Sequence, residues 1–186
     1  MSEVVRQVIE TALLECLPSS MRSVEARLML LTIQKQEDPE ELRYQRVARV
    51  ARTLPENIVD ERWAKGPARS LWQEEMGGCI KGVLQHQATA EIALDLCDRF
   101  GILPTPGSVW RTVETHDVLA ACFARLLLWS DPQPLPKIGA EEQAWRLYLR
   151  TWRPGAYTRG DDGQKSALRH KWAQNYSRTM AELGLA

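Results

Sequence analysis

A glutamate stands at the end of an apolar helical segment, where burial could change its chemistry. Apolar residues at helical spacing begin at Val24 and lead into Gln36-Glu37. Pro39 then ends the helix. A carboxyl group desolvated at such a helix end can hold its proton near neutral pH, as a general acid for glycoside cleavage must. Glu37 is therefore our candidate acid and base, and the alternative is a solvated residue in the polar run QKQEDPEE.

A second segment with suitable residues is KGPARSLWQEEMGG, from Lys65 to Gly78. We expect a glycine-rich turn that enters a helix and lays backbone N–H groups and an amide side chain along a groove wall. An aromatic ring there can stack on the apolar face of a sugar. The candidate substrate-binding residues are Gly66, Ala68, Trp72, Gln73 and Glu75. The alternatives are a structural turn with Trp72 in the core, and Glu74-Glu75 as the exposed end of a short helix.

The C-terminal third interleaves basic and aromatic residues. Between Arg146 and Arg178 there are eight Lys or Arg residues and two Asp residues. Such a patch can contact nucleic acid, an acidic protein or an anionic cell-wall polymer, and the alternative is a solvated face. The candidate partner-binding residues are Arg146, Arg150, Arg153, Arg159, Arg169 and Lys171.

Helical periodicity dominates the elements that must position these residues. We find no alternating strand pattern and predict an all-α fold of eight to ten short helices. These form a single domain over residues 1–186. The alternative is that a basic C-terminal extension begins at about residue 137. Glu40–Thr53 is interpreted as a charged amphipathic segment, and Ser108 as the cap of a short turn. The other predicted helices cover residues 4–16, 24–37, 80–86, 89–100, 116–129, 141–152 and about 165–183.

Composition narrows the classes of function. The 24 basic residues equal the 24 acidic ones, which counts against a protein that depends on phosphate contacts. Four isolated cysteines and three scattered histidines give no metal-binding spacing, so we expect no metal and no cofactor. The N-terminus MSEVVRQVIETALLECL lacks the apolar core of a signal peptide, and we expect neither export by that route nor a membrane span.

The order of Gln36-Glu37-Asp38 and then GPARSLWQ resembles the lytic-transglycosylase and goose-type-lysozyme superfamily. It more closely resembles small bacteriophage-encoded proteins with QES, then GPARGLWQFE and GG, and later LLWTDP, YLRTWRPG and an NY segment. The later elements match Leu127–Pro132, Tyr148–Gly155 and Asn175-Tyr176. Asp38 and Ser70 stand where those patterns have serine and glycine.

This resemblance implies a lysozyme-like, lytic-transglycosylase-like helical domain in a virion-associated phage protein that cleaves or only binds peptidoglycan. It implies that Glu37 acts as acid and then base in a lytic transglycosylase or muramidase reaction. Such a protein is made in the cytoplasm of the infected bacterium and then becomes part of the virion. Its expected partners are peptidoglycan or other virion proteins, and it can also form a homo-oligomer. The alternatives are a purely structural head, tail or connector part, and, ranked last, a helical nucleic-acid-binding regulator.

Overall fold

The protein is a helix-rich α+β domain, and the all-α prediction is wrong. The computed structural model describes residues 3–186, in which the helices are accompanied by a three-stranded antiparallel sheet of order β1-β2-β3. The α-helices are α1 (Glu3–Thr11), α2 (Val24–Glu37), α3 (Lys81–Gln85), α4 (Ala90–Arg99), α5 (Pro106–Val113), α6 (Asp117–Trp129), α7 (Glu141–Trp152), α8 (Gly155–Thr158) and α9 (Asp162–Glu182). The strands are β1 (Tyr44–Ala48), β2 (Trp63–Arg69) and β3 (Glu74–Glu75), and π-helical turns cover Ala12–Cys16 and Met76–Ile80.

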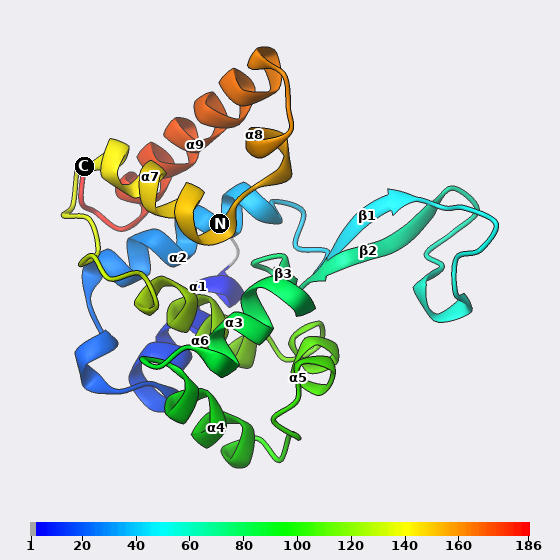
Figure 1. Cartoon of the computed structure of the whole chain (residues 1–186). Helices are drawn as coiled ribbons and strands as arrows, with labels where there is room; N and C mark the ends of the chain where they lie inside the picture. Colours follow the sequence, from blue (N-terminus) through cyan, green and yellow to red (C-terminus); the bar gives the residue numbers. More distant parts are fainter. Residues whose placement is uncertain (1–2) are drawn as a thin grey trace.

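Helix α6 is the central buried helix that its apolar sequence predicts. It packs against α1 to α5 and α7, and most of its side chains are buried. Its first turn is capped by His116, whose Nδ1 accepts a hydrogen bond from Leu119 N. Even Arg125 lies in this core, where its Nε donates to the carbonyl of Met21. Around α6, α7 to α9 lie on one side and α3 to α5 on the other (Figure 1).

The sequence pattern did not predict the sheet, because most residues of its strands are not buried. Strands β1 and β2 form a hairpin that projects away from the helical body (Figure 1). The β1 residues YQRVA are partly or fully exposed on both faces, so no polar–apolar alternation marks them as a strand. The charged amphipathic interpretation of Glu40–Thr53 is therefore corrected to a loop followed by β1. Residues 65–69, expected to belong to a turn entering a helix, form most of β2.

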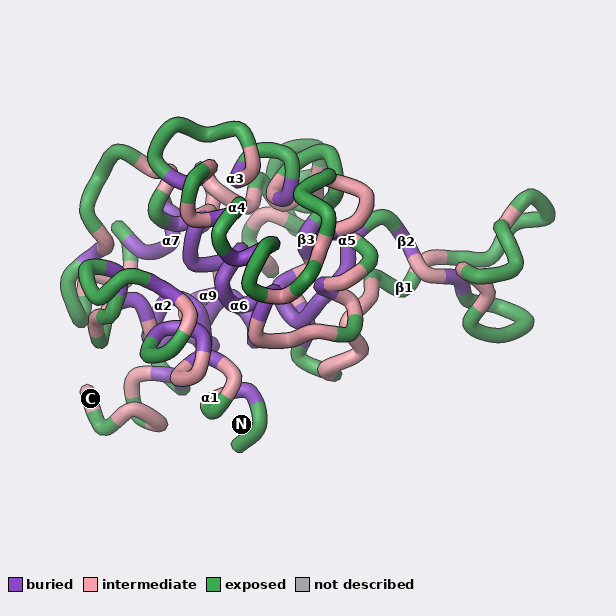
Figure 2. The backbone as a smooth tube through the Cα atoms, turned by 90° about the horizontal axis from the view of Figure 1, so that it is seen from below, coloured by how far each residue is buried: buried purple, intermediate pink, exposed green. Residues whose placement is uncertain are grey.

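The distal part of the hairpin is almost entirely exposed (Figure 2). It covers residues 49–62 and carries Val50 and Leu54 with more than half of their surface open to solvent. At the opposite end of the hairpin, the packing of β1 against β2 favours glycine at position 66. A Cβ there would lie only 2.8 Å from Val47 Cγ1 on the paired strand.

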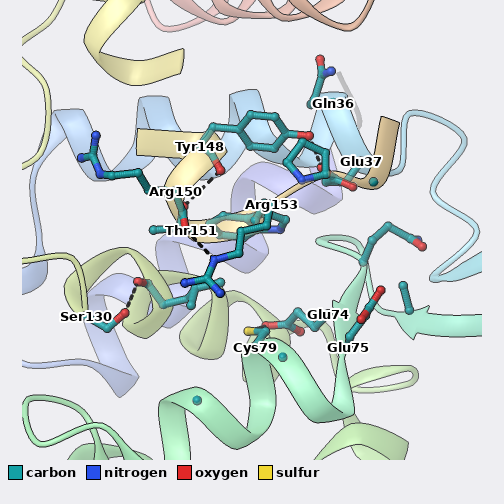
Figure 3. A pocket seen from close by; sticks show the side chains of 18 of the residues that line it. Gln36, Glu37, Glu74, Glu75, Cys79, Ser130, Tyr148, Arg150, Thr151 and Arg153 are labelled. Carbon is teal, nitrogen blue, oxygen red and sulfur yellow. Dashed lines mark hydrogen bonds between the residues drawn. The ribbon is translucent and has the colours of Figure 1, made fainter. Parts of the chain in front are cut away.

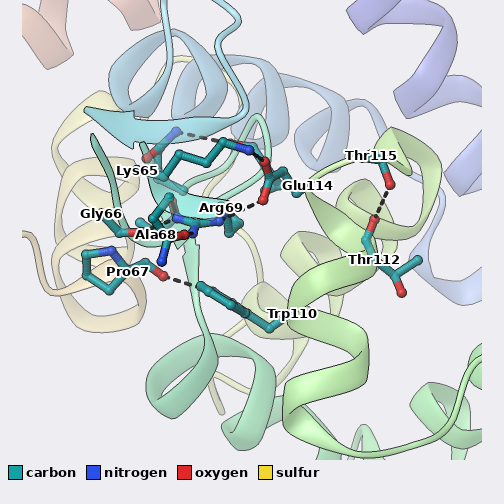
Figure 4. Close-up of polar contacts among 12 residues, drawn as sticks. Lys65, Gly66, Pro67, Ala68, Arg69, Trp110, Thr112, Glu114 and Thr115 are labelled. Atoms are coloured by element: carbon teal, nitrogen blue, oxygen red, sulfur yellow. Dashed lines mark hydrogen bonds and ion pairs between the residues drawn. The ribbon is translucent and has the colours of Figure 1, made fainter. Parts of the chain in front are cut away.

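Buried charge holds the base of the hairpin against α5 (Figure 4). Arg69 is 2% exposed, and its guanidinium forms an ion pair with Glu114 at 2.8 Å. Lys65 pairs with the same carboxylate, and Arg69 also lies over the ring of Trp110. Trp110 Nε1 in turn donates to the carbonyl of Pro67 at 2.8 Å. These contacts fix β2, and through it the turn to β3, relative to the helical body.

Helix boundaries agree well with the capping signals. Ser23 caps α2 by accepting from Ala26 N, and α7 covers the predicted 141–152. Helix α9 starts earlier than predicted because Asp161 and Gln164 form a capping box. Helix α5 is capped by Thr105, whose Oγ1 accepts from Ser108 N, so the prediction that Ser108 is the cap is wrong.

Candidate functional site

A cleft of about 1110 Å³ separates α7 and α8 from the β3–α3 segment. The C-terminal end of α2 closes one side of it, and Glu37, the last residue of that helix, lines the wall (Figure 3). The cleft also takes residues from β1 and from the segment after α6. Side chains far apart in sequence therefore meet around Glu37.

Asp38 shapes the backbone that follows Glu37. This residue is buried, and its carboxylate accepts hydrogen bonds from Leu42 N at 3.0 Å and Arg43 N at 2.7 Å. Arg43 then forms a two-pronged ion pair with Asp117 at the start of α6. The carboxylate of Asp38 thus fixes the loop that follows Glu37, and through Arg43 ties it to α6.

Helix α9 fixes the end of α2 from the other side. Lys171 Nζ donates to the carbonyl of Gln36 at 2.5 Å, and Asn175 Nδ2 donates to Gln36 Oε1 at 2.9 Å. A cation at the last carbonyls of a helix is electrostatically favourable. Glu37 is therefore held by both its own helix and a helix more than 130 residues away in sequence.

Burial raises the pKa of Glu37 to about 7. A hydrogen bond from the Tyr148 hydroxyl and the charge of Lys171 oppose this shift by favouring the carboxylate, while Glu75 adds to it by repulsion. The ring of Tyr148 is stacked on Trp172, with centroids 4.7 Å apart, so the hydroxyl has little freedom to leave Glu37. Near neutral pH the carboxyl group exists in both protonation states, as an acid–base catalyst requires.

Glu74 is a second carboxyl group with a raised pKa, on the opposite side of the cleft (Figure 3). It is 1% exposed, and burial raises its pKa to about 8. Ser70 Oγ donates to Oε2 at 2.9 Å, and Cys79 Sγ donates to Oε1 at 3.6 Å. Glu75 beside it is exposed and faces the cleft. The interpretation of both glutamates as an exposed helix end is wrong for Glu74, because β3 turns that residue inward.

Three of the five predicted substrate-binding residues line the cleft, namely Ala68, Gln73 and Glu75. Gly66 lies in β2, outside the residues that line the cleft. Trp72 is fully buried, with its Nε1 donating to the carbonyl of Leu30 at 2.9 Å. The core alternative for Trp72 is therefore the correct one, and its ring is not available to stack on a ligand.

Most of the basic C-terminal residues are engaged within the chain. Arg146 pairs with Glu142, Arg150 with Asp131, and Arg169 with both Glu141 and Glu142. Lys171 is occupied with α2, as described above. The count of charges from Arg146 onward missed these acids because they precede that range. Arg153 and Arg159 differ, since they line the cleft and form no ion pair with any described residue.

Strained backbone occurs in the cleft wall, at Gln73 and Arg153, and in the turns next to it. The non-glycine residues with positive φ in the described chain are Glu41, Arg43, Ser70, Gln73 and Arg153. Two follow Glu37, two flank the turn into β3, and one ends α7. Each such residue costs about 1 kcal/mol or more, and such residues tend to cluster at functional sites.

Tyr148, Ser70 and Glu74 are site residues that the sequence analysis did not select. Tyr148 lies in the YLRTWRPG element that carries part of the phage resemblance, which was a usable signal. No sequence signal marked Glu74 as a site residue, because an acidic pair close to a glycine pair is typical of a solvated turn. Cys79, treated as an isolated thiol, is its hydrogen-bond partner.

Within residues 3–186, no group of three or more His, Cys, Asp or Glu side chains is arranged to hold a metal ion. No helix in that range is both long and apolar enough to cross a bilayer. No protein-family model matches the chain, and the searches of curated proteins and of solved structures also find no match.

Proposed function

We propose that this protein cleaves the glycan strands of peptidoglycan, with Glu37 as the general acid. The observation that carries the proposal is a partly buried carboxyl group with a pKa of about 7, held at a helix end in the wall of a large cleft. The resemblance to lytic transglycosylases and lysozymes at Gln36-Glu37 adds support from the sequence.

In the proposed reaction, Glu37 donates its proton to the glycosidic oxygen as the C–O bond breaks. The leaving sugar thereby departs as an alcohol, and positive charge develops at the ring left behind. The Glu37 carboxylate then takes a proton from the nucleophile, which is a water molecule or a hydroxyl group of the same sugar. Tyr148 holds the carboxyl group in place, and the exposed carboxylate of Glu75 stabilises the positive charge.

The cleft suits a polymer better than a small metabolite. Its volume exceeds the range of typical small-ligand pockets, about 300–1,000 Å³. Polar side chains such as Gln45, Gln73 and Ser130 line it along its length. These groups can hydrogen-bond to sugar hydroxyl and amide groups.

We place this activity in a bacteriophage virion, on the strength of the resemblance alone. The projecting hairpin favours a second candidate, in which the chain is a structural virion part without activity. Exposed Val50 and Leu54 at its distal end suit a contact with another virion protein. A nucleic-acid-binding regulator has less support, because intramolecular acids neutralise Arg146, Arg150 and Arg169.

The test is the loss of turbidity and the release of reducing or anhydro ends from purified cell walls. Wild-type protein should degrade the walls, and Glu37→Gln should not. Glu91→Gln, an exposed acid on α4 far from the cleft lining, serves as the matched control and should behave as wild type. Equal rates for Glu37→Gln and wild type, or no cleavage at high protein concentration, would contradict the proposal in favour of the structural role.

A further inference from the structure

Two cations in the cleft form no ion pair with any acid of the described residues, 3–186. Arg153 and Arg159 are exposed and line the same cleft as Glu37, yet neither pairs with an acid in residues 3–186. The nearby Asp131 is already occupied by Arg150, at 2.8 Å. Arginine presents a planar fork of N–H donors that matches a carboxylate, and both side chains line the cleft.

The backbone at Arg153 is unfavourable for arginine. This residue ends α7 in the left-handed conformation, with φ 48° and ψ 54°. Glycine or asparagine usually occupies such a position, because a Cβ is strained there. Pro154 follows at once and fixes the direction of the chain. The Arg153 side chain lies in the cleft between Tyr148 on one side and Glu74 on the other (Figure 3), and its Nε donates to the carbonyl of Arg150 at 3.3 Å, which leaves the other guanidinium N–H groups for a ligand.

Arg159 reaches the same wall from the end of α8. Its guanidinium folds over Gly155, where a Cβ would lie 3.3 Å from Arg159 Cζ. Gly155 thus leaves the space that the guanidinium occupies. Because Gly155 is only two residues from Arg153, both cations belong to one short segment of the cleft wall, residues 153–159.

We infer that Arg153 and Arg159 form a subsite for carboxylates carried by the glycan. This inference rests on the proposed function and extends it to the substrate: peptide-bearing peptidoglycan rather than a neutral glycan such as chitin. Two sources of carboxylate exist in that polymer, namely the stem peptides and the lactyl group of a muramic acid whose peptide has been removed. Acidic Glu75 on the opposite wall repels such groups, so the charged substituent of the substrate is directed toward residues 153–159.

The experiment measures binding in the Glu37→Gln background, so that the probe is not cut. The probes are soluble peptidoglycan fragments with their stem peptides, the same fragments with carboxyl groups converted to amides, peptide-free fragments that retain the lactyl carboxylate, and neutral chitooligosaccharides. Intact fragments should bind at least tenfold more tightly than amidated fragments or chitooligosaccharides. Comparable binding of peptide-free and intact fragments would show that the subsite accepts either the lactyl or the stem-peptide carboxylate, and weak binding of peptide-free fragments identifies the stem peptide as the ligand.

The double variant Arg153→Asn with Arg159→Gln should bind intact and amidated fragments equally. Added salt, which should weaken the binding of intact fragments to the protein with both arginines, should have little effect on the double variant. Asparagine tolerates the left-handed conformation, so the melting temperature should be unchanged or higher, which separates binding from folding. Arg146→Gln removes an exposed arginine of α7 that pairs outside the cleft, and it should leave binding unchanged.

Equal binding of intact and amidated fragments would overturn the inference, as would full binding by the double variant or no binding of any probe. Failure of the proposed function has a different signature: wild type would bind carboxylate-bearing fragments through these arginines but would not cleave cell walls.

Discussion

Glu37 and Glu74 lie on opposite sides of one cleft and share a raised pKa, but their surroundings differ. Glu37 is partly buried at a helix end, and its carboxyl group accepts a hydrogen bond from the Tyr148 hydroxyl. Glu74 is 1% exposed in β3, and each of its oxygens accepts a hydrogen bond, one from Ser70 and one from Cys79. Desolvation raises both pKa values, to about 7 and about 8.

The difference shows that a raised pKa alone does not make a catalytic acid. A proton donor must also reach the bond that breaks. Both residues line the cleft, but Glu37 is partly exposed and accepts one hydrogen bond, whereas Glu74 is 1% exposed and both of its carboxyl oxygens are occupied, by Ser70 and Cys79. We therefore propose a catalytic role for Glu37 and a structural role for Glu74, as a buried acid that is mostly neutral at pH 7.

The largest expected effect separates the two residues by activity. Glu37→Gln should reduce the rate of cell-wall cleavage by about 10³-fold, the range for loss of a general acid. Glu74→Gln should stay within about threefold of wild type, because an amide keeps the shape and can still accept from Ser70. Rates of reducing-end release from purified walls give both values. A loss in Glu74→Gln as large as in Glu37→Gln would reverse the assignment.

The pH dependence of the free energy of unfolding should show that ionisation of either carboxyl group destabilises the folded protein. A carboxyl group whose pKa is raised in the folded state binds protons more tightly there than in the unfolded chain. The free energy of unfolding therefore falls as pH rises from about 4.5 to the folded pKa, about 8 for Glu74 and about 7 for Glu37. Above pH 8, Glu74→Gln should be more stable than wild type by roughly 3 to 5 kcal/mol, and Glu37→Gln by roughly 2 to 3 kcal/mol.

Urea unfolding at pH 4 and pH 9 measures this effect, since the variants should match wild type at pH 4. Variants that gain nothing at pH 9 would show that the two carboxyl groups are not desolvated.

A smaller effect is expected from Tyr148→Phe. The hydroxyl favours the Glu37 carboxylate by donating to it, so its loss should raise the pKa of Glu37 further. The pH above which cleavage declines should move upward, with a loss of rate below tenfold near pH 6. The pH dependence of kcat/KM measures this, and Trp110→Phe, which alters an aromatic residue at the hairpin base, is the control. A downward move would contradict the assigned direction of the hydrogen bond.

The smallest effect is expected from Ser70→Gly. Glycine removes the strain of φ 72° at this position but also removes the hydroxyl that donates to Glu74. The two contributions oppose one another, so the free energy of unfolding should change by no more than about 1 kcal/mol. Cleavage should be unchanged, as measured on the same cell walls. A large loss of activity would mean that the Ser70–Glu74 turn takes part in catalysis.

Helical periodicity and capping signals were enough to predict α2, α6 and α7 and to select Glu37. Strand β1 was mistaken for part of a helical segment because its exposed residues show no alternation. Trp72 was misplaced for a different reason: an aromatic residue beside glycines fits either a groove or a core. Only tertiary contacts, here its hydrogen bond to Leu30, separate the two. Likewise, no local pattern could bring Tyr148 to a carboxyl group 111 residues away.

The pH dependence of cell-wall cleavage by the wild-type protein tests the central claim most directly. If Glu37 acts in its protonated form, kcat/KM should be highest below pH 7 and should fall about tenfold for each pH unit above it. Glu74→Gln should give the same profile, which excludes the group with the pKa of about 8. A rate that rises through pH 7, or stays constant from pH 5 to pH 9 while the protein remains folded, would contradict the assignment of Glu37 as the proton donor.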